Sequence, residues 1–82
     1  MDYFHGWLRT TIKGKYRSLR KFAQTAGIEV SHFYQIVNGV QYPSPYTLSL
    51  IFKTLGTDPV EQKDVVWQIW CEKASYNSRN KF

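Results

Sequence analysis

The chain has 82 residues, of which 43% are hydrophobic and 17% aromatic, and its formal net charge is +5. This length predicts one small domain with a thin core, and the composition excludes a disordered chain. The single Cys71 excludes an internal disulfide framework and a cysteine-rich zinc site. Apolar runs fall short of the roughly 18 residues of a membrane span, and the N-terminus does not resemble a signal peptide, so we expect a cytoplasmic protein without a membrane partner.

Positive charge is concentrated in the N-terminal half of the sequence. Apart from His5, every charged residue between Asp2 and Glu29 is a cation: Arg9, Lys13, Lys15, Arg17, Arg20 and Lys21. Most of the acids fall in the last third of the chain. A basic block of this kind attracts polyanions such as nucleic acid, although a solvated basic face without a partner would have the same composition.

The sequence predicts five helices and no strand. The first covers about residues 2–13, where apolar side chains recur every four positions and form one stripe: Phe4, Leu8 and Ile12. The second begins after Ser18, because a serine hydroxyl can cap the N–H groups of a first helical turn. It ends at Gly27, in the position where a helix end needs a positive φ.

The third and fourth helices follow after short loops. The third is predicted over about residues 30–38, with Phe33 and Ile36 on its packed face. The fourth has Ser44 as its N-cap, Pro45 in its first position and Gly56 at its end.

The fifth helix opens with the run Asp58-Pro59-Val60-Glu61, which has an N-cap, a first-position proline and a capping-box glutamate. We expect it to end near Ser75, so that residues 1–75 form the domain and residues 76–82 a flexible basic tail. It has more apolar residues than one buried face requires. A two-fold dimer contact is therefore predicted at four of them: Val66, Trp67, Ile69 and Trp70. The alternatives are that both tryptophans seal the core or that this helix binds another protein.

The second and third helices are separated by so short a turn that they must cross steeply, which is typical of a helix–turn–helix. The scaffold positions follow one ordered pattern: Leu19, Phe22, Ala23, Gly27, Ile28, Ser31, Ile36, Gly39, Pro43, Ser44, Thr47, Leu48, Ile51, Leu55 and Gly56. This pattern resembles the Cro and lambda-repressor-like family of helix–turn–helix domains, the XRE family. The resemblance implies an all-α, five-helix lambda-repressor-like DNA-binding domain with its helix–turn–helix at the second and third helices.

The resemblance also implies where DNA is contacted. Base edges would be read from the start of the third helix and one turn further in, at Glu29, Val30, Ser31, His32, Tyr34 and Gln35. Gln35 is favoured for direct readout, because its amide can donate to and accept from adenine. Phosphates would be contacted from the start of the second helix and the loop after the third, at Arg17, Ser18, Leu19, Asn38, Gln41, Tyr42 and Ser44, and the basic block adds Lys13 and Lys15.

Residues 28–52 contain no Lys or Arg, so the third helix cannot make the common contact between arginine and guanine. We therefore expect it to recognise AT-rich DNA. The predicted function is a sequence-specific regulator of transcription that binds double-stranded DNA at the nucleoid, as a homodimeric repressor on a pseudo-palindromic operator. The rival is a protein-binding helix–turn–helix module, such as an antitoxin, that uses the fifth helix. His5 and His32 are too isolated for a metal site, and without a nucleophile–base arrangement we expect neither a cofactor nor an enzyme.

Overall fold

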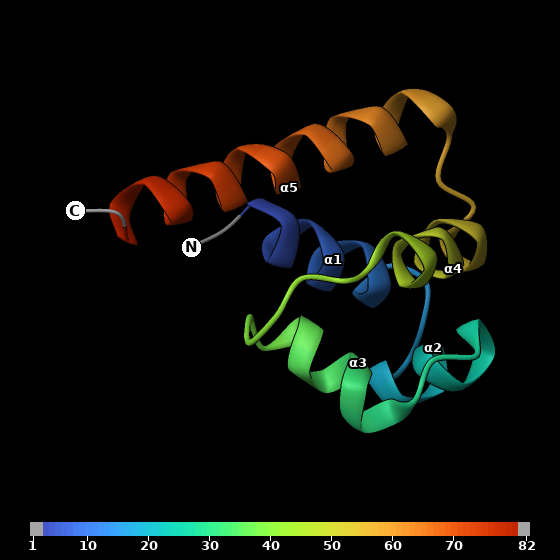
Figure 1. Cartoon of the computed structure of the whole chain (residues 1–82). Helices are drawn as coiled ribbons and strands as arrows, with labels where there is room; N and C mark the ends of the chain where they lie inside the picture. Colours follow the sequence, from blue (N-terminus) through green and yellow to red (C-terminus); the bar gives the residue numbers. More distant parts are fainter. Residues whose placement is uncertain (1–2, 81–82) are drawn as a thin grey trace.

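The computed structural model describes residues 3–80, and these residues form five helices and no strand, which confirms the predicted all-α class. The helices are α1 (Tyr3–Lys13), α2 (Leu19–Ala26), α3 (Val30–Val37), α4 (Pro45–Leu55) and α5 (Pro59–Asn80). Helix α5 lies along one side of the domain and α2 and α3 along the opposite side, with α1 and α4 between them (Figure 1). Within residues 3–80, none of the helices is both long and apolar enough to cross a lipid bilayer.

Local capping sets the beginnings of three helices. The Ser18 hydroxyl accepts a hydrogen bond from the Lys21 N–H at 3.0 Å. The Ser44 hydroxyl accepts from the Thr47 N–H at 3.2 Å. Asp58 Oδ1 accepts from two first-turn N–H groups of α5, at 2.9 and 3.0 Å. Each cap satisfies backbone donors that have no partner inside the helix, so the three predicted starts are confirmed.

Helices α2 and α4 end where the sequence predicts, at glycines in the left-handed region. Gly27 has φ 78° and Gly56 has φ 69°, values that strain any residue with a Cβ. After Gly27 the chain reaches α3 within residues 27–29, and the Ile28 N–H closes the end of α2 on the Ala23 carbonyl at 2.9 Å. The short connection holds α2 directly against α3, with the rings of Phe22 and Phe33 5.3 Å apart.

All five helices contribute apolar side chains to one core: Phe4, Leu8, Ile12, Phe22, Ala23, Ala26, Ile28, Phe33, Ile36, Val37, Leu48, Ile51, Phe52, Leu55, Val65 and Ile69. Phe33 and Ile36 are completely buried, as predicted. Helix α3 packs against α1 and α2, with Phe33 beside Phe22, and these contacts fix its position. The exposed side of α3 is therefore presented on a rigid base.

Helix α5 is longer than predicted. It continues to Asn80, past the expected end at Ser75, and most of the predicted tail is helical backbone. Polar composition alone does not end a helix, and residues 60–80 contain neither the glycine nor the proline that would. The last two residues of the predicted tail, 81 and 82, and the expected first residue of helix α1, Asp2, lie outside the described residues.

Two acidic side chains of α5 hold the beginning of α1. Glu61 was predicted to complete a capping box, but its carboxylate instead accepts from the Trp7 indole N–H at 3.1 Å. The Glu72 carboxylate accepts from the Phe4 backbone N–H at 3.1 Å and, through its other oxygen, from the Tyr42 hydroxyl at 2.6 Å. Glu72 therefore caps α1 and ties the loop between α3 and α4 to α5.

Removal of this carboxylate should destabilise the fold. We expect Glu72→Ala to lower the free energy of unfolding by about 1–3 kcal/mol, because the Phe4 N–H and the Tyr42 hydroxyl both lose their acceptor. Tyr42→Phe removes only one of the two bonds and should cost about 1 kcal/mol. Urea denaturation with an unchanged m-value measures both effects. The matched control is Asp64→Ala, an exposed acid of the same helix; equal midpoints for Asp64→Ala and Glu72→Ala would contradict the assignment.

Candidate nucleic-acid interface

Helix α3 is divided into a buried face and an exposed face. Phe33, Ile36 and Val37 are in the core. Of the predicted base-contacting residues, Glu29, Ser31, Tyr34 and Gln35 are exposed and His32 is half-buried. Val30 is half-buried as well, but it packs against the core, so it does not share the exposed face.

Glu29 and Ser31 occupy the first turn of α3. The Ser31 hydroxyl donates to the Glu29 carboxylate, while Glu29, in the N-cap position, makes no side-chain cap to α3. The carboxylate adds negative charge at this helix end, where it is favourable to the helix but unfavourable beside a phosphate. This end of α3 is therefore better suited to base amines than to the DNA backbone.

Gln41 joins the loop to the exposed face of α3. Its side-chain Nε2 lies 2.9 Å from His32 Nδ1 and 2.9 Å from Gln35 Oε1. His32 and Gln35 are three residues apart, so they are neighbours on one face of the helix. Gln41 was predicted to contact phosphate, but its side-chain amide is hydrogen-bonded to two side chains of α3. Nothing in the local pattern indicates this pairing, which depends on how the loop folds back.

Arg9 reaches from α1 to the carboxyl end of α3. Its guanidinium donates to the Val37 carbonyl from Nε at 3.3 Å and from Nη2 at 3.2 Å, and to Asn38 Oδ1 at 3.2 Å. A cation at the end of a helix satisfies carbonyl groups that lack an intrahelical partner. Asn38 was predicted to contact phosphate, and in the structure its side-chain oxygen accepts a hydrogen bond from Arg9.

Two further predicted phosphate contacts have structural partners. The Lys15 ammonium donates to the Leu55 carbonyl at the end of α4. The Tyr42 hydroxyl donates a hydrogen bond to the Glu72 carboxylate, and the Tyr42 ring lies 5.3 Å from the His5 ring. Both contacts join segments far apart in the sequence, so local spacing could not indicate them. Lys15 and Tyr42 therefore stabilise the fold, and their contact with phosphate stays a prediction.

The other basic side chains of the N-terminal half lie at the end of α1, in the following loop and in the first turn of α2. Lys13, Arg17, Arg20 and Lys21 are exposed. Ser18 caps the helix as described, and Leu19 is its first residue, so the Leu19 N–H has no intrahelical acceptor. Positive charge and first-turn N–H groups together make this helix end a suitable place for a phosphate. Ser44, the other predicted contact, caps α4 and also donates to the Thr47 hydroxyl at 3.1 Å.

The opposite side of the domain has an apolar surface on α5. Trp67 is 61% exposed, Trp70 64% and Val66 49%, whereas Ile69 is only 8% exposed. Ile69 was predicted in the dimer contact, but it packs in the core, because Val65 and Ile69 are four residues apart and share the inward face. The two tryptophans do not seal the core.

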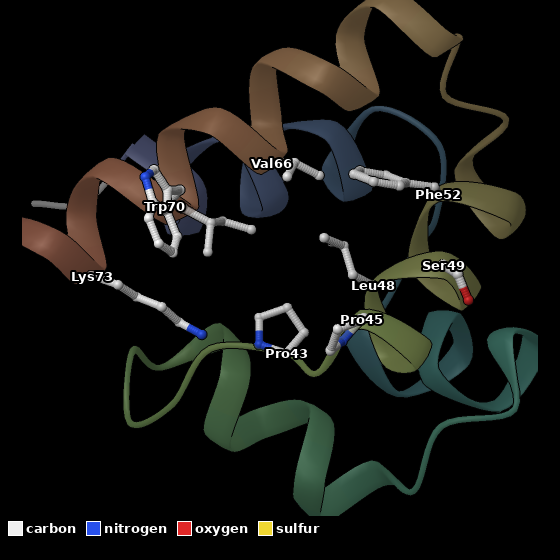
Figure 2. Close-up of a pocket in the computed structure, with 9 residues that line it drawn as sticks. Pro43, Pro45, Leu48, Ser49, Phe52, Val66, Trp70 and Lys73 are labelled. Carbon is white, nitrogen blue, oxygen red and sulfur yellow. The ribbon is translucent and has the colours of Figure 1, made fainter.

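A groove runs between this surface and α4. The groove has a volume of about 400 Å³, and its apolar lining includes Pro43, Pro45, Leu48, Phe52, Val66 and Trp70. Figure 2 shows Val66 and Trp70 of α5 facing Leu48 of α4 across the groove, with Lys73 at one end. Among residues 3–80, no group of three His, Cys, Asp or Glu side chains could hold a metal ion.

Comparisons with known proteins found no matching family model, no matching curated protein and no matching solved structure. Membership of the Cro and lambda-repressor-like family therefore stays a prediction made from the scaffold residues. A function for this chain has to be argued from the two surfaces on opposite sides of the domain, the polar one on α2 and α3 and the apolar one on α5.

Proposed function

We propose that the protein binds double-stranded DNA sequence-specifically, with α2 and α3 acting as a lambda-repressor-like helix–turn–helix. The observation that carries the proposal is the α2–α3 pair itself: two eight-residue helices joined through Gly27, with a polar exposed face on α3. In this arrangement α3 enters the major groove and α2 crosses the backbone. The start of α2, with Arg17, Arg20 and Lys21, then lies where a phosphate would be bound.

In this proposal the protein is a homodimer joined through α5. Val66, Trp67 and Trp70 are large apolar side chains exposed on one helix, and apolar side chains of this size on a surface are typical of interfaces. A two-fold axis would let the tryptophans of each copy enter the α4–α5 groove of the other. Binding to a pseudo-palindrome further requires that this axis bring both α3 helices to the same side of the dimer, about 34 Å apart.

We further propose repression as the mode of regulation, since occluding a promoter needs only DNA binding. The rival proposal is a protein-binding module, such as an antitoxin, that binds its partner through α5. The same exposed tryptophans favour it, so the two proposals differ in what α2 and α3 bind.

Selection of bound sequences from random duplex DNA, at low salt and with the purified chain, tests the proposal. We expect enrichment of a motif with two half-sites about one helical turn apart. The matched control is Gln35→Ala, which leaves the core intact and should weaken the motif at the base pair that Gln35 reads. Absence of any enrichment would reject DNA binding and favour the protein-binding rival.

A further inference from the structure

The contacts of Gln41 fix the direction of hydrogen bonding on the exposed face of α3. A glutamine Nε2 carries two N–H donors and no acceptor. In this structure one donor goes to Gln35 Oε1 and the other to His32 Nδ1, each at 2.9 Å. Both hydrogens of the Gln41 amino group are therefore used, and both partners act as acceptors toward the loop.

This direction determines what the two α3 side chains present on their other sides. Since Gln35 turns its carbonyl oxygen toward Gln41, its NH₂ group is directed away from the loop. Since His32 accepts at Nδ1, the proton of the neutral ring is on Nε2. Gln35 and His32 therefore both offer N–H donors, one helical turn apart.

Paired donors distinguish between the purines. In the major groove guanine presents two acceptors, N7 and O6, whereas adenine presents the acceptor N7 and the donor N6–H₂. An NH₂ group directed at the adenine amine would leave two donors facing each other, each without an acceptor.

From this geometry we infer that Gln41 is a positioning residue for base recognition and that the base read by Gln35 is guanine. The inference rests on the proposed DNA-binding function and names the base class that the same surface would take. It replaces the expectation of adenine readout by Gln35, which requires the amide both to donate to the base and to accept from it. It also supplies guanine recognition to a helix that has no arginine.

The test reverses the direction of the hydrogen bond between residue 41 and Gln35. A carboxylate only accepts, so in Gln41→Glu the Gln35 NH₂ group must turn toward the loop and its oxygen toward the DNA. The preferred base at that position should then change from guanine to one with an amine, adenine or cytosine. Gln41→Leu releases the Gln35 amide, and the preference should become weak.

The measurement is competitive binding of duplexes that differ only at this base pair, at one fixed salt concentration. Gln35→Ala identifies the position, because it should flatten the preference there. We expect the unaltered protein to prefer guanine over adenine by about tenfold or more, Gln41→Leu to reduce the ratio to near one, and Gln41→Glu to invert it. Val40→Glu adds the same charge at the preceding loop position, which is 72% exposed, and should lower affinity without changing the ratio.

The outcomes separate this inference from the proposed function. If the unaltered protein selects a motif but prefers adenine at this position, or if the Gln41 variants keep its ratio within about twofold, DNA binding stands and the inference is wrong. If no duplex is bound at low salt, the proposed function fails and the inference fails with it. A merely structural role of Gln41 would lower affinity for all duplexes equally and leave the ratio unchanged.

Discussion

The double variant Trp67→Ser/Trp70→Ser is expected to be a folded monomer. Both side chains are more than half exposed, at 61% and 64%, so their loss removes little of the core and should change folding stability only slightly. In the proposed dimer they are the largest apolar groups buried between two copies, and truncation of such a tryptophan costs about 2–4 kcal/mol of association energy. Two truncations in each copy should weaken the dimer by at least about a hundredfold.

Sedimentation at tens of micromolar, with thermal unfolding of the same samples, measures this effect. The matched control is Tyr46→Ser, which removes an aromatic side chain 72% exposed on α4, and which should remain dimeric. A double variant that stays dimeric would place the contact elsewhere. A monomeric mass for the unaltered protein, both with and without DNA, would reject the dimer itself.

Loss of the dimer should be visible in DNA binding. A dimer gains from two linked half-sites, by about 10²–10⁴ over a single half-site. We expect the unaltered protein to favour a duplex with two half-sites by a factor in this range, and the tryptophan double variant to bind each half-site independently. If α5 binds a different protein instead, the substitutions should leave DNA binding unchanged.

The salt dependence of DNA binding is expected to decrease when Arg17 and Lys21 are both replaced by alanine. Each phosphate neutralised by a side chain contributes about −0.9 to the slope of log affinity against log salt concentration. Removal of both side chains should make the slope shallower by about 1.8. Because the contacts go to phosphates, affinity should fall for all sequences by a similar factor.

Lys15→Ala is the matched control for this experiment. It removes a positive charge from the same basic block, but its ammonium already donates to the Leu55 carbonyl. The slope should therefore stay close to that of the unaltered protein, while α4 loses a cap and stability falls modestly. Titrations at several salt concentrations give both slopes. If Lys15→Ala flattens the slope as much as Arg17→Ala does, the surface at the start of α2 is not the phosphate-binding region.

Much of the fold was predictable because the signals for it are local. A serine cap such as Ser18 and a glycine in the left-handed region such as Gly27 act within a few residues of their own position. The buried side chains of α3 follow from its helical repeat in the same way. The sequence predicts an end of α5 near Ser75, but the helix continues to Asn80. The polar run after Ser75 does not stop the helix, because it contains neither glycine nor proline.

The candidate site was less predictable, because many of its side chains make hydrogen bonds to residues that are far away in the sequence. Glu72 meets Phe4 at a separation of 68 positions, and Arg9 meets Val37 at a separation of 28. Residue type and spacing indicated which residues of α3 are buried, Phe33 and Ile36, but did not show that Gln41 is bound to this helix. Periodicity can tell which face of a helix is exposed, but it cannot tell which exposed groups already have partners.

The hydrogen bond between Tyr42 and Glu72 has a consequence for regulation. Gln41 is bound to α3 and the next residue, Tyr42, is bound to α5, so a two-residue stretch connects α3 to the opposite side of the domain. A partner on α5 that changes the Tyr42–Glu72 contact could change the affinity of α3 for its ligand only if this stretch passes the change on to Gln41. By thermodynamic reciprocity, ligand on α3 would then change the affinity of α5 for that partner by the same factor. Occupancy of the two surfaces would then be a single coupled equilibrium.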